Sequence, residues 1–396
     1  MAQAVINPRI RGFVCLTSHP VGCAANVARQ IAVAKASGPG KGLGNVLVIG
    51  ASAGYGLASL ITTVFGHGAK ALAVAYERPG QGEKAASAGW YNIAAVQRAA
   101  GGAVKAMNGD AFSDALKQQV VEALKAGFGK IDAVVYSLAS PKRKDPASDT
   151  VWSSVLKPIG APYASKTIDL DSDTIKPVSI AQATDAEIAA TIQVMGGDDW
   201  KRWIDALLAA DLLAPGCRTV AYSYIGPQLT HAIYRAGTIG RAKDHLEATA
   251  VFLSASIRAR CGASAGAWVS VNKALVTQAS SAIPVVPLYI SLLYKIMKEK
   301  QCHEGTIEQM VRLWRDHLAP GKTPAVDEVG RIRVDDWEMR PDVQAAVAAL
   351  WEQVDSANLL AVSDYASFKR EFRQLFGFEI DGVDYTVPVE TEASWA

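Results

Sequence analysis

Two side chains in the second half of this 396-residue chain could move a proton at a developing oxyanion. Tyr234 carries a phenol, and Lys243 follows it nine residues later. A phenol has an unperturbed pKa of about 10, and a neighbouring ammonium group lowers that pKa because it favours the phenolate. A tyrosine and a lysine held together could therefore donate a proton to an oxyanion and recover it.

The spacing of this pair predicts how the backbone runs between its members. A helix turns by about 100° per residue, so nine steps place two side chains on opposite faces. Tyr234 and Lys243 therefore cannot share one regular helix and one site. Gly237 and Gly240 offer a break, and Thr238 between them could cap a helix N-terminus. We expect Tyr234 to precede a long helix over residues 238–258 and Lys243 to lie in its early turns.

A glycine-rich turn in the first half of the chain could bind a phosphate. The turn follows an apolar run at residues 45–49 and precedes a helical pattern at residues 57–65. Glycines let the backbone approach a pyrophosphate, and amide N–H groups at a helix N-terminus face its charge. In this context the pattern predicts a nicotinamide dinucleotide site, with a tight strand–helix turn without a ligand as the alternative. The turn consists of Gly50, Ala51, Ser52, Ala53, Gly54, Tyr55 and Gly56.

The end of the second strand predicts which dinucleotide binds. Residues 69–76 form that strand, so Tyr76 ends it and Glu77 follows, 21 residues after Gly56. An acidic side chain at this place accepts hydrogen bonds from the ribose 2′-OH and repels a 2′-phosphate. We therefore expect Tyr76 and Glu77 to contact the cofactor, and NADH to be preferred over NADPH. Arg78 could instead receive a phosphate, and Glu77 could be only a solvated strand end.

Strands and helices alternate through the first half of the chain. Strands over residues 102–107 and 131–137 flank a helical pattern at residues 114–126. This alternation predicts an α/β fold of the Rossmann type, a doubly wound parallel sheet whose ligand crosses the carboxyl ends of the strands. By topology alone, four further cofactor contacts are expected there: Asp110, Ala111, Leu138 and Ala139.

We expect a single large Rossmann-type domain over residues 1–396. Gly196 and Gly197 could make part of an inserted region flexible, or merely kink a helix. Lys142, Arg143 and Lys144 in the same region could touch a phosphopantetheine or a carrier protein, although a solvated loop is the simpler interpretation. The expected parts are an N-terminal extension (1–44), the first half of the dinucleotide-binding core (45–140), an insertion with lid helices (141–217), the catalytic half (218–319) and a C-terminal helical extension (320–396).

Composition argues against several classes of function. Half of the residues are apolar and a fifth are charged, which is typical of globular proteins. The net charge of +2 is too small to indicate nucleic acid or a membrane surface as a partner. The longest apolar stretch, near residues 282–293, is shorter than the about 20 residues that a transmembrane helix needs. Five scattered cysteines form no C-x-x-C pair, so neither a metal centre nor a disulfide framework is expected. We expect a cytoplasmic monomer.

Several longer stretches resemble those of the FabV-type trans-2-enoyl-ACP reductases and their trans-2-enoyl-CoA reductase relatives. The glycine-rich turn and the eight residues between Tyr234 and Lys243 belong to this resemblance. The matching stretches occur in order and cover nearly the whole chain, so they are more specific than a glycine pattern alone. The other stretches are residues 8–13, 19–23, 89–92, 135–141, 194–197, 220–226, 276–284 and 375–378.

The resemblance implies a reaction and a set of roles. The reaction is NADH-dependent reduction of the C2–C3 double bond of a trans-2-enoyl thioester on acyl carrier protein or CoA, the last step of the fatty-acid elongation cycle, with hydride added to C3. Tyr234 is then the proton donor, Lys243 binds the nicotinamide ribose and supports Tyr234, and Tyr224 hydrogen-bonds the thioester carbonyl. The resemblance also implies that the cofactor or the site is lined by Leu275, Val276, Thr277 and Tyr55.

Two other functions are weighed against this one. A short-chain carbonyl reductase or dehydrogenase has Tyr-x-x-x-Lys, which Tyr234 and Lys243 do not form. A nucleotide-binding regulator without catalytic activity would lack one member of the pair, and both members are present.

Overall fold

A computed structural model describes residues 2–40 and 42–396. Met1 and Lys41, both in the expected N-terminal extension, lie outside the described residues. Within the described part of the chain, the central feature is a seven-stranded sheet in which every pairing is parallel. Its strands are β4 (Asn45–Ile49), β5 (Lys70–Ala75), β6 (Val104–Asn108), β7 (Ile131–Tyr136), β12 (Leu213–Ser223), β13 (Gly266–Val271) and β14 (Ile332–Arg333).

The strand order confirms the predicted doubly wound sheet. The order is β14-β13-β12-β7-β4-β5-β6, so the chain first builds outward from β4 to β6 and then returns to build outward from β7. The reversal falls between β4 and β7, which pair with each other. In sheets of this kind, ligands bind outside the carboxyl ends of the strands at such a reversal. The glycine-rich turn follows β4 directly and therefore lies at this point.

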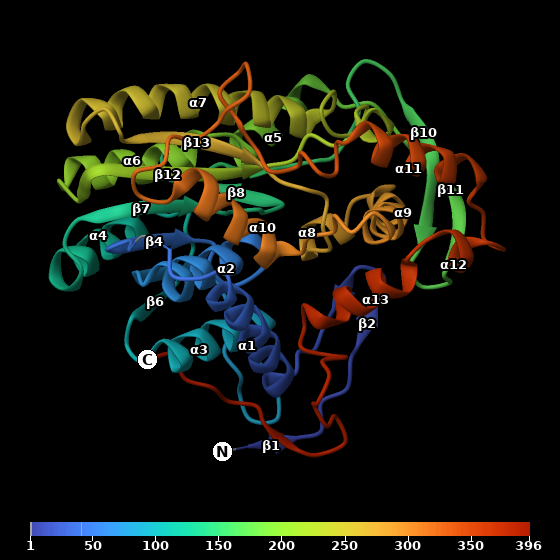
Figure 1. Ribbon diagram of the computed structural model, residues 1–396, viewed down its shortest axis with the longest axis horizontal. Helices are drawn as coiled ribbons and strands as arrows, with labels where there is room; N and C mark the ends of the chain where they lie inside the picture. Colours follow the sequence, from blue (N-terminus) through green and yellow to red (C-terminus); the bar gives the residue numbers. More distant parts are fainter. Residues whose placement is uncertain (1, 41) are drawn as a thin grey trace.

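Helices cover both faces of the sheet, because the central strands are apolar on both sides (Figure 1). Val46 and Val48 of β4 face one core, whereas Leu47 and Ile49 face the other. This is the pattern expected for a strand of a parallel sheet buried on both faces. The first core includes α1 (Pro20–Ala36), α2 (Gly54–Ile61), α3 (Ala88–Ala100) and α10 (Thr306–Leu313). The second includes α4 (Asp114–Gly127), α6 (Asp198–Ala209) and α7 (Thr238–Cys261).

A third core lies beside the sheet and contains much of the C-terminal part of the chain (Figure 1). Three tyrosines expected at the site, Tyr55, Tyr224 and Tyr234, pack partly buried against this third core. The C-terminal extension is therefore a wall of the predicted site. The elements of this core include α9 (Val286–Glu299), α11 (Pro341–Gln353), α12 (Leu359–Val362), α13 (Tyr365–Gln374) and the hairpin of β10 (Tyr163–Asp169) with β11 (Thr174–Ile180).

Short pairings tie the ends and loops of the chain to this framework. β1 (Gln3–Ala4) pairs with β15 (Val389–Glu390), so the two termini lie on the same side of the molecule (Figure 1). No helix in the described residues is long and apolar enough to cross a membrane. The remaining short elements are β2 (Ile10–Arg11), β3 (Val14–Cys15), β8 (Lys142–Lys144), β9 (Val151–Ser153), α5 (Asp185–Met195) and α8 (Gln278–Ser281).

The two glycines of the inserted region serve close packing between helices. They separate α5 from α6, and a Cβ on Gly197 would lie only 2.1 Å from Oγ1 of Thr249 in α7. The backbone amide of Gly197 also donates to Nδ1 of His245 in α7. Trp200 and Trp203 of α6 are completely buried. These contacts favour a fixed wall over a moving lid at this place.

The basic run in the insertion is not the solvated loop that its charges suggested. Arg143 is only 4 % exposed and lies in β8, where its guanidinium donates to the carbonyl of Gln193. Lys142 and Lys144 flank it on the exposed side of the strand. Strand alternation places the middle residue inward, which the composition of the run could not indicate.

Candidate active site

The glycines of the turn allow close backbone packing, and the helix after the turn begins without a side-chain cap. Gly50 has a φ of +82°, and a Cβ on it would lie 2.0 Å from the carbonyl oxygen of Ser137 at the end of β7. A Cβ on Gly56 would lie 1.9 Å from the carbonyl oxygen of Gly50. No side chain caps the N-terminus of α2, so its first amide groups remain available to an anion. These residues fit the pyrophosphate of a dinucleotide.

The carboxylate of Glu77 lies beside this turn. Ser52 of the turn donates its hydroxyl to Oε1 of Glu77 at 2.6 Å. A Cβ on Gly89, near the start of α3, would lie 2.1 Å from the same oxygen, so the carboxylate is at the N-terminus of that helix. The helix dipole stabilises a negative charge there. This is the position in which an acid can accept hydrogen bonds from a ribose. The neighbouring Tyr76 side chain is 77 % exposed.

Residues from distant segments meet at the glycine-rich turn. A Cβ on Gly50 would lie 3.1 Å from Cδ2 of Leu138, and a Cβ on Gly54 would lie 3.8 Å from Cγ2 of Thr277. The hydroxyl of Tyr55 donates to the carbonyl of Lys273 at 2.7 Å. The turn therefore lies between the end of β7 and the segment after β13, as expected for Leu138 and Thr277. Of the other expected contacts, Leu275 and Val276 are buried and Ala139 is exposed.

Buried side chains of α4 and α6 hold the loop after β6 in place. The carbonyl of Ala111 accepts hydrogen bonds from Nζ of Lys117 at 2.9 Å and from Nε1 of Trp203 at 3.1 Å. Lys117 also pairs with Asp199 at 2.7 Å, and both side chains are almost fully buried. The carboxylate of Asp110 accepts from the amide of Phe112 within the same loop. This buried ion pair fixes the backbone on which the two expected contacts, Asp110 and Ala111, are placed.

The backbone breaks between Tyr234 and Lys243, as their spacing predicted. Tyr234 lies in turns before α7, and Lys243 lies in the early turns of that helix. The helix cap differs from the expectation, because Gly237 occupies the N-cap position and Thr238 is the first helical residue. The Thr238 hydroxyl is instead used to hold the carbonyl of Val155 in the insertion. The rings of Tyr234 and Tyr224 meet edge to face at 4.8 Å.

The pKa of Tyr234 differs from the expectation for a phenol beside an ammonium group. Nζ of Lys243 donates to the carbonyl of Tyr222 at 3.0 Å, and no hydrogen bond between these described residues joins it to Tyr234. Burial raises the pKa of Tyr234, and the carboxyl of Glu338 raises it further. Burial lowers the pKa of Lys243 to about 8. Desolvation, which disfavours the charged form of each group, is the largest cause of both pKa shifts.

The sequence reasoning missed a buried polar cluster behind the tyrosines. Its centre is Glu338, whose Oε1 lies 3.1 Å from the Tyr224 hydroxyl. In the sequence, Glu338 ends an acidic run that looks like a solvated loop, and no spacing rule connects it with Tyr224. The other members are Tyr289, Lys273, Gln309 and Glu304.

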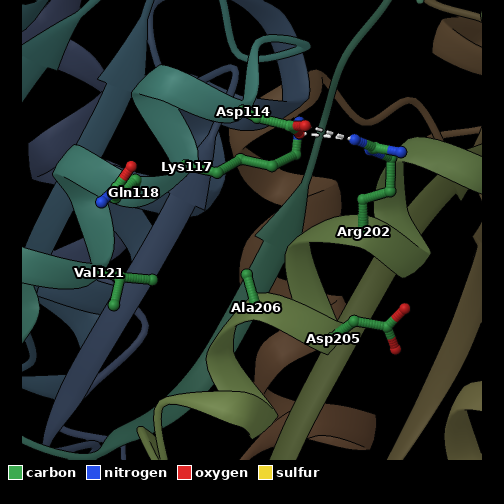
Figure 2. A pocket seen from close by; sticks show the side chains of 7 residues that line it. All are labelled: Asp114, Lys117, Gln118, Val121, Arg202, Asp205 and Ala206. Carbon is green, nitrogen blue, oxygen red and sulfur yellow. Dashed lines mark hydrogen bonds and ion pairs between the residues drawn. The ribbon is translucent and has the colours of Figure 1, made fainter. Parts of the chain in front are cut away.

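A surface groove between α4 and α6 is separate from these residues (Figure 2). It has a volume of about 450 Å³, and an ion pair between Asp114 and Arg202 spans it. None of the residues predicted from the sequence for the site lines it. In the described residues, no group of three or more His, Cys, Asp or Glu side chains could hold a metal ion.

The sheet order, the uncapped glycine-rich turn and the acid after β5 together define a nicotinamide-dependent oxidoreductase of the Rossmann type. Three family models match nearly all of the chain: the NAD(P)H binding domain of trans-2-enoyl-CoA reductase at residues 5–82, the trans-2-enoyl-CoA reductase catalytic region at residues 84–319, and the enoyl reductase FAD binding domain at residues 326–389. The chain belongs to the trans-2-enoyl-CoA reductase family.

Individual relatives agree with this assignment. The enoyl-[acyl-carrier-protein] reductase [NADH] of Flavobacterium johnsoniae is 54 % identical over 384 residues, which is 96 % of each chain. The Coxiella burnetii protein of the same name is 52 % identical over 397 residues, covering 98 % of this chain and 96 % of that protein. The trans-2-enoyl-CoA reductase of Treponema denticola, solved in complex with NAD, is 46 % identical with a TM-score of 0.93, covering 98 % of this chain and 99 % of that one. The Clostridium acetobutulicum trans-2-enoyl-CoA reductase, solved with NADH, is 40 % identical with a TM-score of 0.94, covering 98 % of each chain.

Proposed function

We propose that the protein uses NADH to reduce the C2–C3 double bond of a trans-2-enoyl thioester to the saturated acyl thioester. The observation that carries this proposal is the edge-to-face pair of Tyr224 and Tyr234, which packs against the same core as Tyr55 of the dinucleotide turn. A carbonyl reductase needs one proton donor at the carbonyl oxygen, whereas two phenols can stabilise an enolate and supply a proton. The family assignment favours the same reaction over a carbonyl reductase.

The proposed roles follow from the positions of these side chains. When bound, NADH supplies the hydride that adds to C3. Tyr224 donates a hydrogen bond to the thioester carbonyl and stabilises the enolate charge that develops on its oxygen. Tyr234 is the proton donor. Lys243 binds the ribose on the nicotinamide side, and its bond to the Tyr222 carbonyl holds it beside β12.

The cofactor contacts expected from the sequence remain part of this proposal. Glu77 selects NADH because its carboxylate, held by Ser52, meets the ribose. The other proposed contacts are the glycine-rich turn from Gly50 to Tyr55, then Tyr76, Asp110, Ala111, Leu138, Ala139, Leu275, Val276 and Thr277.

For the carrier, we propose acyl carrier protein. Relatives at 52–54 % identity are named for that carrier, and the solved structures at 40–46 % identity are named for CoA. We also propose that the chain acts as a monomer and as one domain over residues 1–396. Rates with matched enoyl thioesters on both carriers test the choice of carrier. Light scattering during size-exclusion chromatography tests whether the chain is a monomer.

The deciding experiment follows NADH absorbance with crotonyl-CoA and with crotonyl-acyl carrier protein. We expect turnover that Tyr234→Phe abolishes while NADH binding, followed by fluorescence, stays intact. Absence of turnover with every enoyl thioester from short to long chains would overturn the proposed reaction. Full activity of Tyr234→Phe would overturn the assigned proton donor alone.

A further inference from the structure

Glu338 is a fully buried carboxyl group on the loop that follows β14. Two ion pairs hold this loop: Asp335 pairs with Arg333 of β14 at 2.7 Å, and Asp336 pairs with Arg312 of α10 at 2.8 Å. The loop therefore places one carboxyl group in the third core, next to Tyr224. A buried carboxyl costs free energy unless its hydrogen bonds compensate, so its partners must be accounted for.

Two of its partners donate to it. The amide of Ala274 donates to Oε2 of Glu338 at 2.7 Å. The hydroxyl of Tyr289 lies 2.7 Å from Oε1, and the oxygen of that hydroxyl already accepts from Nε2 of Gln344. Gln344 occupies one lone pair of that oxygen, so the Tyr289 proton is directed at Glu338 while a second lone pair stays free. Both carboxyl oxygens accept a hydrogen bond whether or not Glu338 carries a proton.

For the third partner, Tyr224, the direction of the hydrogen bond depends on whether Glu338 carries a proton. Its hydroxyl oxygen lies 3.1 Å from Oε1 of Glu338, and a phenol has only one proton to donate. Beside an ionised Glu338, that proton is committed to the carboxylate and cannot reach a substrate. Beside a neutral Glu338, the acid donates to the Tyr224 oxygen, and the Tyr224 proton is free to point into the site.

The surroundings of Glu338 favour the neutral acid. Burial raises its pKa, and Asp335 acts in the same direction. Lys273 opposes this shift, but its Nζ donates to the Ala274 carbonyl, and burial lowers the pKa of Lys273 to about 8. Within residues 2–40 and 42–396, the phenols that interact with Glu338 include Tyr224, Tyr289, Tyr234 and Tyr55.

We propose that Glu338 is a positioning residue that, as the neutral acid, donates to the oxygen of Tyr224 and so turns the Tyr224 hydroxyl towards the substrate carbonyl. This inference rests on the proposed function, because it assumes that Tyr224 binds the thioester. It gives the segment after β14 a part in the reaction without any contact with the substrate. Hydrogen bonds in such a chain polarise one another, so the acid also makes Tyr224 a stronger donor.

The variant Glu338→Gln distinguishes a donor from an acceptor. The Ala274 amide must face the oxygen of the new side chain, so its two N–H groups face the phenols, one towards the Tyr224 oxygen and one towards the free lone pair of Tyr289. The amide then donates to Tyr224 at every pH, as the neutral acid does. We expect kcat and the KM for NADH to stay within a few-fold of wild type. If Glu338 is instead an ionised acceptor in the wild type, the same variant releases the Tyr224 proton, and kcat should rise well above that of wild type, which would overturn the proposal.

The matched control is Glu371→Gln. Glu371 is another largely buried carboxyl that accepts from a phenol, the hydroxyl of Tyr294 at 2.8 Å, and it has no bond to Tyr224. We expect this change to leave kcat and its pH profile unchanged. In wild type, kcat at saturating NADH should decline as pH rises through the raised pKa of Glu338, and Glu338→Gln should remove that decline. A decline that persists in Glu338→Gln contradicts the proposal.

Infrared difference spectroscopy on the free protein tests the protonation state without any turnover. At neutral pH, wild type minus Glu338→Gln should show the C=O stretch of a protonated carboxyl, and its absence overturns the proposal. Tyr224→Phe should shift the same band, because the acid loses its acceptor, and this variant serves if Glu338→Gln does not fold. Since no substrate is present, this result is independent of the proposed reaction, which fails only if the wild-type protein has no enoyl reductase activity.

Discussion

Glu77→Gln should change the cofactor preference without disturbing the shape of the site. The amide has the size of the carboxylate, which matters because a Cβ on Gly89 would already be 2.1 Å from Oε1. Its oxygen can still accept from the Ser52 hydroxyl, which lies 2.6 Å from the same atom. The substitution therefore removes the charge and keeps both the packing and the hydrogen bond.

The magnitude follows from Coulomb's law. Two unit charges at about 4 Å repel by about 1 kcal/mol in bulk water and by about 4 kcal/mol at an effective dielectric constant of 20. The half-buried Glu77 carboxylate lies between these limits. A 2′-phosphate carries more than one charge at neutral pH. We therefore expect the ratio of kcat/KM for NADPH to that for NADH to rise by about 10- to 100-fold, since every 1.4 kcal/mol is about tenfold.

The assay measures kcat/KM for both cofactors at one fixed concentration of enoyl thioester. Glu83→Gln, which removes the same charge from an exposed side chain a few residues away, is the control and should leave the ratio unchanged. Raising the salt concentration should bring the NADPH-to-NADH ratios of kcat/KM for wild type and Glu77→Gln closer together, because screening weakens the repulsion between Glu77 and the 2′-phosphate. An unchanged ratio in Glu77→Gln would refute the proposed contact with the ribose.

Three further predictions concern the turn, the lysine and the buried ion pair. Gly56→Ala places a Cβ 1.9 Å from the Gly50 carbonyl oxygen, and such overpacking costs about 1–3 kcal/mol. Fluorescence titration should therefore show weaker binding of NADH to this variant. In the control variant Gly42→Ala the new Cβ meets nothing within 4 Å, so NADH binding should not change. Because folding lowers the pKa of Lys243 from 10.5 to about 8, its ammonium group is lost as pH rises through that value. NADH affinity measured by calorimetry should therefore fall above pH 8, and Lys243→Arg, which stays charged, should not show this fall. Asp199→Asn leaves the buried Lys117 without its partner and should lower the free energy of unfolding, measured in urea, by about 3–5 kcal/mol. The exposed pair of Lys201 and Asp205 is the control, and Asp205→Asn should lower the free energy of unfolding by about 1 kcal/mol or less. Equal costs for the two pairs would contradict this account of burial.

The sequence alone determined the sheet and the identity of the cofactor, and it predicted where the cofactor binds. Apolar runs such as residues 45–49, each followed by a turn and a helical pattern, can bury both faces only in a parallel sheet, so the order of strands and helices was readable. The glycines after β4 and the acid after β5 have fixed places in such a fold, so the expected cofactor was NADH. The angle between successive helical residues also predicted the break between Tyr234 and Lys243, and the structure confirms it.

Only the tertiary structure decided which groups contact the tyrosines and shift their pKa values. Glu338 lies 114 residues after Tyr224, and the two meet because β14 adds to the sheet edge and the loop after it turns back over the site. Local pattern carries no information about such a contact, and an acidic run looks solvated until packing buries it. Desolvation is likewise a property of the packed state, which is why the pKa of Tyr234 is raised although a neighbouring ammonium group was expected to lower it. The sequence thus indicated where the proposed reacting groups lie along the chain, and burial decided how strongly each of them holds its proton.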